Sequence, residues 1–315
     1  MDIFNLSSFN PGPFTLWGIP GLELFHTWIG VPLCAIYLVT LAGNAILLWL
    51  IAVEHSLHEP MFFFLSMLAA TDVIMSTASI PKTLGIFWLG AQEITFSGCL
   101  TQMFFLHCSF IIDSGILLAM AYDRYVAICS PLRYTTMLTP QISAKILVGI
   151  VVRSFCVILP CVFLLKRLPY CRTRIIPHTF CEHIGVARLS CADISINIWY
   201  GFAVPMMTVF SDMALIAVSY IFILRSVFSL SSRGAHQKAL STCGSHICVI
   251  LLFYTPALFS GLVHRFGHNI PRTFHVLFSN FYVAIPPALN PLIYGVRTKQ
   301  IRDKVILLFR LKGVQ

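Results

Sequence analysis

Long stretches with almost no charged residues divide this sequence, and they constrain its fold more than any other feature. Each is long enough to cross the ~30 Å hydrocarbon layer of a bilayer as a helix of about 20 residues. Only 10% of the residues are charged, against about 25% in an ordinary soluble domain. The sequence therefore predicts an all-α membrane protein, a bundle of seven transmembrane helices. The apolar runs lie at about 28–53, 61–81, 99–122, 142–165, 196–224, 239–263 and 273–296.

The orientation of the bundle follows from the basic residues in its loops. We predict one domain, with a tail at 1–27, a helix bundle at 28–296 and a short helix and tail at 297–315. Cytoplasmic loops are rich in Lys and Arg, whereas residues 1–27 contain neither. We therefore expect an extracellular N-terminus, with Asn5 in the sequence Asn-Leu-Ser as a glycosylation acceptor. Twelve basic residues then lie in inner segments and eight in outer ones, and Arg153 lies within a span.

The formal net charge of +9 does not indicate a nucleic-acid partner, because the basic residues lie between the apolar runs and not on one face. Residues 297–311 alternate basic and apolar positions. An amphipathic helix of this kind lies on an anionic inner leaflet, so membrane lipid is the partner that the charge predicts.

Four cysteines lie in segments that we place outside the cell. Cys99 opens the third span, and Cys171, Cys181 and Cys191 recur through the long loop 166–195. An oxidising exterior permits disulfides at these positions. The sequence alone leaves three connectivities open.

The end of the third run carries the most specific motif. Residues 120–134 read MAYDRYVAICSPLRY, which resembles the signature of the olfactory receptors, a family of rhodopsin-like G-protein-coupled receptors. Matching motifs cover the rest of the chain: GN at 43–44, PMFFFL at 60–65, SY at 219–220, KALSTCGSH at 238–246, FYTP at 253–256 and PALNPLIY at 287–294. KRLPYC at 166–171 and VHRFG at 263–267 resemble the fish-like branch, whose members often respond to carboxylic acids.

The resemblance implies roles for named residues. Cys99 would pair with Cys181, and Cys171 with Cys191. Arg124 would be the switch read by the G protein. An isolated Arg there would rather snorkel to the interface, but the surrounding motif reverses that preference. The groups around the switch would be Asp123, Tyr125, Tyr220, His246 and Tyr294.

Asp72 and Asp113 are carboxylates within spans, where each charge costs at least roughly 2.5–3.5 kcal/mol. The resemblance implies a site for sodium or for a shared proton. A buried hydrogen-bonded pair is the plain alternative. An aspartyl protease dyad is disfavoured, because Asp113 follows Phe110-Ile-Ile and not Gly-x-Gly. Asp212 is a further carboxylate within a span, and no role follows for it.

The resemblance also predicts a pocket between the third, fifth and sixth spans, beneath the long loop. Arg265 would bind a carboxylate there, the alternative being a snorkelling role. The predicted lining residues are His107, Phe110, Ile111, Ile184, Gly201, Pro205, Tyr254 and Gly261. A weaker alternative in the long loop is a metal site at His178, Glu182 and His183.

We therefore expect an odorant receptor, not an enzyme, without a cofactor other than a sodium ion. It would respond to medium-chain fatty acids in the plasma membrane and raise cyclic AMP through a stimulatory olfactory G protein. Pro256 and Pro291 would kink their spans and provide pivots. The alternative from another class is a transporter or channel lined by the intramembrane carboxylates. Such a protein often shows symmetry between its halves, which this sequence lacks.

Overall fold

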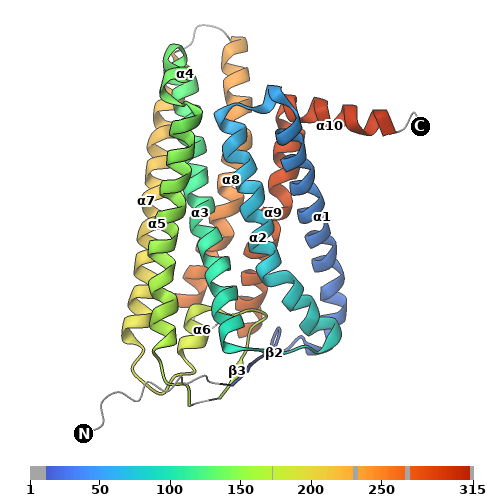
Figure 1. Ribbon diagram of the computed structural model, residues 1–315, viewed down its shortest axis with the longest axis vertical. Coiled ribbons are helices and arrows are strands. Elements are labelled where there is room, and N and C mark those ends of the chain that lie inside the picture. The colour runs from blue at the N-terminus through green and yellow to red at the C-terminus, as the bar shows by residue number, and fades with distance from the viewer. Residues whose placement is uncertain (1–11, 172, 230–232, 267–269, 313–315) are drawn as a thin grey trace.

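The computed structural model describes residues 12–171, 173–229, 233–266 and 270–312, apart from the side chains at 233, 235–236, 238–242, 260–266 and 308–312. Seven long helices lie side by side and form the predicted bundle (Figure 1). They are α1 (His26–Val53), α2 (Pro60–Leu89), α3 (Phe96–Cys129), α5 (Pro140–Lys166), α7 (Ser195–Phe228), α8 (Arg233–Phe266) and α9 (Arg272–Arg297).

The bundle has two distinct ends. One end carries three short strands, β1 (Phe14–Leu16), β2 (Glu93–Ile94) and β3 (Ile175–Ile176), and is called the sheet end below. The other, called the α10 end, carries the short helix α4 (Tyr134–Met137) and α10 (Lys299–Lys312), which runs across the bundle axis (Figure 1). The loop after α5 contains one more short helix, α6 (His183–Ala187), at the sheet end.

Several helices extend beyond the predicted runs. The second run was expected to end at residue 81, but α2 continues to Leu89, and α3 extends the third run at both ends. Apolar runs mark only the part of a helix that lies in hydrocarbon, whereas backbone hydrogen bonding continues until a stop signal. The helix α2 ends at the C-cap residue Gly90, whose φ of 63° is left-handed. The N-cap residue of α3 is Thr95, whose side chain accepts a hydrogen bond from the backbone N–H of Gly98 at 3.1 Å.

The three-stranded sheet is a feature that the apolar pattern did not predict. Its strand order is β2-β1-β3, with β1 antiparallel to β2 and parallel to β3. Phe14 and Leu16 on β1 are fully buried, and Phe14 packs against Phe96 with ring centroids 5.8 Å apart. The N-terminal segment thus joins the α2–α3 connection to the long loop and covers part of the sheet end.

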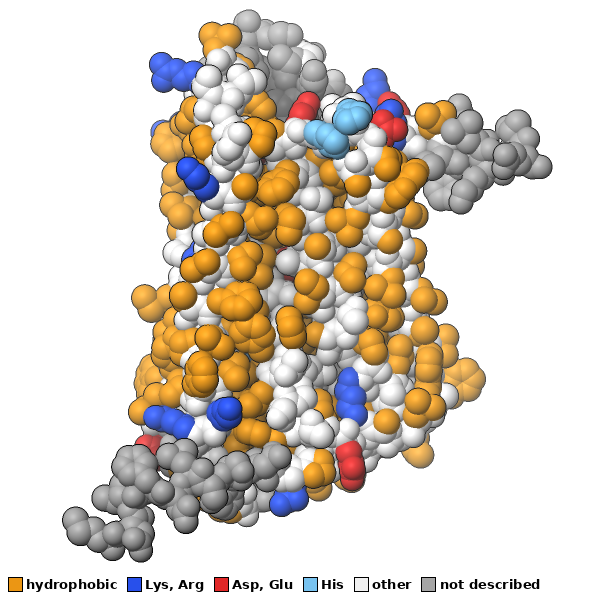
Figure 2. All heavy atoms as spheres, viewed as in Figure 1, with side chains coloured by type: hydrophobic (Ala, Val, Ile, Leu, Met, Phe, Trp, Pro, Cys, Tyr) orange, Lys and Arg blue, Asp and Glu red, His pale blue; other side chains and the backbone are white. Residues whose placement is uncertain are grey.

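The surface of the bundle has the distribution of side chains that a bilayer requires. Hydrophobic side chains cover its middle, and Lys and Arg gather mainly toward the two ends (Figure 2). Large apolar side chains are exposed along the middle of the helices, among them Met207 of α7 at 72% and Leu251 of α8 at 59%. Among the described residues, six helices are long and apolar enough to cross a membrane, and α8 contains a shorter apolar segment, Cys243–Phe259. The chain is a multi-pass membrane protein.

The α10 helix is joined to the bundle by charge and by packing. Lys304 Nζ lies 2.5 Å from Glu54 Oε2, just after α1, and Ile301 is 1% exposed. The helices α8 and α9 continue through Pro256 and Pro291, so neither proline ends its helix.

Candidate functional site

The long loop between α5 and α7 is fixed at the sheet end by two disulfides. Cys99 at the start of α3 is bonded to Cys181, and Cys171 is bonded to Cys191, as the resemblance implied. Cys181 also donates its backbone N–H to Gln102 Oε1 at 2.9 Å. These links hold the middle of the loop against α3, over the region where we expected a ligand.

His107, His183 and Gly201 meet beneath this loop. The His183 ring, on α6, occupies the space that a side chain at Gly201 would need, because a Cβ there would overlap the ring. Burial and the neighbouring His107 on α3 together lower the pKa of His183 to about 4. His183 is therefore uncharged at neutral pH, and α3, α6 and α7 approach one another closely at this point.

The remaining predicted lining residues lie at different depths. Phe110 stacks on Phe253 of α8, with ring centroids 4.6 Å apart, and Ile111 is buried in the core at 1% exposure. Pro205 is half-buried, and Ile184 packs against the core cluster at the sheet end. The side chain of Arg265, the surroundings of Gly261 and all of Asn5 lie outside what the structure describes.

The loop histidines do not form a metal site. His178 Nε2 lies 3.8 Å from Glu182 Oε1, whereas His183 is directed toward Gly201 and His107. Within the described ranges, no group of three or more His, Cys, Asp or Glu side chains could hold a metal ion. The weaker metal prediction for this loop is wrong, because His178 faces Glu182, whereas His183 faces Gly201 and does not join them.

A chain of polar contacts crosses the middle of the bundle. Arg153 of α5 binds both carboxylate oxygens of Asp212 on α7, at 2.6 and 2.9 Å. Asp212 Oδ2 accepts a hydrogen bond from Ser114 Oγ of α3 at 2.7 Å. Ser114 Oγ lies 2.8 Å from the Tyr254 hydroxyl on α8. Four helices are thus connected through four polar side chains. The last of these side chains, Tyr254, lies two residues before Pro256.

This polar chain was not predicted from the sequence. Arg153 was unexplained within a span, no role followed for Asp212, and Ser114 was not among the candidate residues. The sequence did contain a signal for the Arg153–Asp212 pair. Two opposite charges within apolar spans cost free energy unless they pair, so a basic and an acidic residue in such spans are expected to meet. Gly115 allows the approach of α5 to α3, since a Cβ there would lie 2.8 Å from Arg153 Nη2.

Asp72 and Asp113 lie in the core and have different partners. Asn290 donates to both carboxylate oxygens of Asp72, at 3.2 and 2.9 Å, and Thr71 donates to Asp113 Oδ1. Asp113 Oδ2 and Asn290 Oδ1 are buried and have no hydrogen-bond partner. Carboxylate and carbonyl oxygens are the ligands that hard cations prefer. The residues therefore fit a cation, and they fit a proton shared between the carboxylates equally well.

The predicted switch residues gather toward the α10 end. Asp123 Oδ1 accepts from the Tyr134 hydroxyl of α4 at 2.8 Å, and the Tyr220 hydroxyl lies 2.8 Å from His246 Nδ1. The Tyr294 hydroxyl donates to Met120 Sδ at 4.0 Å. Tyr125 packs on Phe222, with ring centroids 6.0 Å apart.

Arg124 is half-buried among these groups, near Tyr220, His246 and Tyr294. Its guanidinium makes no ion pair with a carboxylate of the described residues, because Asp123 is bonded to Tyr134 instead. The Arg124 guanidinium thus lies near two tyrosine hydroxyls and one imidazole, and it is available to a binding partner at the α10 end.

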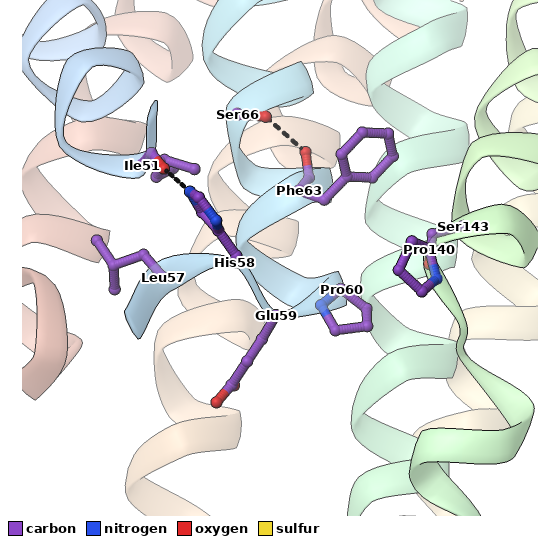
Figure 3. A pocket seen from close by; sticks show the side chains of 9 residues that line it. All are labelled: Ile51, Leu57, His58, Glu59, Pro60, Phe63, Ser66, Pro140 and Ser143. Atoms are coloured by element: carbon purple, nitrogen blue, oxygen red, sulfur yellow. Dashed lines mark hydrogen bonds between the residues drawn. The ribbon is translucent and has the colours of Figure 1, made fainter. Parts of the chain in front are cut away.

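A cavity of about 290 Å³ also opens at the α10 end, between the starts of α2 and α5. Figure 3 shows His58, whose Nε2 lies 3.0 Å from the Ile51 carbonyl oxygen, and Pro60 opposite Pro140. It lies at the opposite end of the bundle from His107 and His183, so it is separate from the predicted ligand region.

Comparisons with known proteins agree with this geometry. Residues 33–312 match the family described as olfactory receptor. Human olfactory receptor 52H1 is 73% identical over 309 residues, which cover 98% of each chain. Human olfactory receptor 52B2 is 58% identical, over 97% of this chain and 94% of that relative. The crystal structure of squid rhodopsin superposes with a TM-score of 0.73 at 17% identity, covering 91% of this chain and 81% of that one, and thus shares the fold.

Proposed function

The chain belongs to the olfactory receptor family, whose members are non-enzymatic G-protein-coupled receptors for small odorants, and from this premise we propose which odorant it detects and how it signals. The odorants are medium-chain carboxylic acids. The receptor acts in the plasma membrane with its N-terminus outside, and it raises cyclic AMP through a stimulatory olfactory G protein. Its similarity to receptors 52H1 and 52B2 is consistent with the fish-like branch.

The two disulfides support an outward-facing sheet end. Disulfides persist in oxidising compartments and are rare in the cytosol, and both of them lie in the sheet-end loop. The amphipathic helix α10 then lies at the inner leaflet, where its basic residues meet anionic lipid. Arg124 and its neighbours face the cytoplasm in this orientation, as coupling to a G protein requires.

The polar chain from Arg153 to Tyr254 is the observation that carries the receptor mechanism. Tyr254 lies beside Phe253, whose ring stacks on Phe110 of the ligand region, and two residues before Pro256. A ligand that moves Phe110 or Phe253 also acts on the bond between Tyr254 and Ser114. Breaking that bond frees α8 to pivot at its proline. The ligand activates the receptor to the extent that it binds the pivoted arrangement more tightly than the resting one.

Carboxylate recognition rests on the charges at the sheet end. Arg265 follows Tyr254 on α8 by eleven residues, about 16 Å along a helix, which places it at the outer mouth. A guanidinium can bind a carboxylate through two parallel hydrogen bonds. The segment after the fourth span adds basic residues at the sheet end: Lys166, Arg167, Arg174 and Arg188. The alternative function of a transporter is not favoured, because the family consists of receptors.

We expect a straight-chain fatty acid of medium length to activate the receptor, and its methyl ester to be at least tenfold weaker, because a charge-assisted pair contributes about 1.5–3 kcal/mol. Arg265→Ala should remove this preference for the acid. The measurement is cyclic AMP in cells that express the receptor, over a concentration series of acid and ester. Arg272→Ala, which removes a cation from the start of α9, is the matched control. Equal potency of acid and ester on the unmodified receptor would refute the carboxylate assignment.

We further propose that a sodium ion or a shared proton occupies the space between Asp72 and Asp113. The unpaired oxygens of Asp113 and Asn290 supply ligands for it. Basal cyclic AMP should change when choline replaces sodium in the medium, and Asp113→Asn should abolish that change. Sensitivity to pH but not to sodium would indicate the shared proton instead. A sodium response that persists in Asp113→Asn would rule out the site.

A further inference from the structure

Asn197 is a fully buried polar residue at the sheet end of the bundle. It lies near the start of α7, it is 0% exposed, and neither its Nδ2 nor its Oδ1 has a hydrogen-bond partner. Buried amides are nearly always hydrogen-bonded, since an unpaired one loses its hydration without compensation. Both atoms of this amide are therefore available to the polar group of a ligand.

Two histidines in the same region also have unused hydrogen-bonding capacity. Nε2 of His107 and Nε2 of His183 are buried and have no partner. Asn197 precedes Gly201 by four residues, so the two lie on one face of α7, and the His183 ring packs on Gly201. The helix α6, which carries His183, packs against α7. Asn197 thus lies one helical turn from the glycine on which the His183 ring packs, and His107 is close enough to His183 to influence it electrostatically.

We propose that Asn197, His107 and His183 form a subsite for an uncharged hydroxyl or carbonyl group of the odorant. The ligand is then a carboxylic acid that carries a second polar group on its chain, such as a hydroxy or oxo acid. This inference rests on the proposed function, because it assumes that the odorant binds between α3, α6 and α7. The receptor would then recognise two groups of the odorant, the carboxylate through Arg265 and an uncharged polar group through this subsite.

The chemistry of the three groups favours a neutral partner. An amide donates and accepts but carries no charge, and His183 stays neutral at pH 7 because burial and the nearby His107 lower its pKa to about 4. A carboxylate is bound more strongly by a charged donor such as a guanidinium, whereas an amide and neutral imidazoles, which donate and accept without charge, match a hydroxyl or a carbonyl. A site of this kind discriminates strongly against an analogue that lacks the polar group, since the buried groups then remain unpaired.

The test compares octanoic acid with octanoic acids that carry one hydroxyl or one oxo group at successive chain positions. Cyclic AMP is measured for each, and binding is measured as the shift in melting temperature of the purified receptor. We expect the best-placed hydroxy or oxo acid to act at an about tenfold lower concentration than octanoic acid. In Asn197→Leu this difference should disappear, and the ligand-free receptor should melt at a higher temperature because the unpaired amide is gone.

Two further variants separate recognition from folding. Gly201→Ala should remove the same preference, because its Cβ would displace the His183 ring. Ser211→Ala, on an exposed position of α7, should leave the preference intact. If no chain position of the hydroxyl or oxo group improves binding, or if Asn197→Leu keeps the full preference, the subsite is refuted. If hydroxylated alcohols without a carboxylate bind as well as the hydroxy acids, the subsite stands and the carboxylate proposal fails.

Discussion

Arg124→Ala is expected to abolish the cyclic AMP response while the receptor still reaches the cell surface and still binds its odorant. Arg124 lies near the α10 end, far along α3 from His107, and it makes no ion pair with a described carboxylate. Its removal therefore costs little in folding, but it removes the cation that the G protein would contact. The measurements are cyclic AMP, surface labelling and ligand-induced thermal stabilisation of the same variant.

Arg133→Ala provides the control for this experiment. Arg133 lies in the connection between α3 and α4 and is exposed, so its loss also removes a basic residue from the α10 end. We expect Arg133→Ala to signal nearly as the unmodified receptor does. Normal signalling by Arg124→Ala would show that Arg124 only snorkels to the interface, and the coupling mechanism would then be wrong.

Arg153→Met is expected to destabilise the receptor by roughly 3–5 kcal/mol, because it leaves the Asp212 carboxylate buried without its cation. Asp212 is 1% exposed, and Arg153 binds both of its oxygens. Such a loss is a large fraction of the stability of a typical protein. Surface expression should fall to near background, and the melting temperature of any purified receptor should fall as well.

The double variant Arg153→Met with Asp212→Asn tests whether the unpaired charge is the cause. It has no buried charge at this position, and the Asn side-chain oxygen can still accept from Ser114. Replacing both members of a buried ion pair is often nearly neutral in stability, so expression should recover. Equal loss in the single and the double variant would mean that packing of the Arg153 stem, and not the charge, stabilises the contact. Lys145→Met, elsewhere on α5, serves as the control.

The sequence determined the membrane fold because hydropathy is a local property. A run of about 20 apolar residues must form a helix in a bilayer, where the backbone has no other hydrogen-bond partners. The seven helices, the amphipathic α10 and the residue string around Arg124 could therefore be read without any contact information. The cysteine pairing is an intermediate case: the cysteines could be identified from their positions, but only the resemblance to a family selected Cys99 with Cys181 and Cys171 with Cys191.

Tertiary structure decided which distant polar groups meet. Arg153 and Asp212 are 59 positions apart and Ser114 and Tyr254 are 140 apart, so no spacing rule connects them, and only the packing of α5, α7, α3 and α8 does. The sequence likewise does not show that Asn197 is unpaired, because this depends on whether the neighbouring elements place a hydrogen-bond donor or acceptor beside its amide. Hydropathy is a property of each residue along a helix. Pairing of polar side chains depends instead on how each helix is rotated about its axis and how deep each residue lies in the bundle, and the contacts among all helices together determine both.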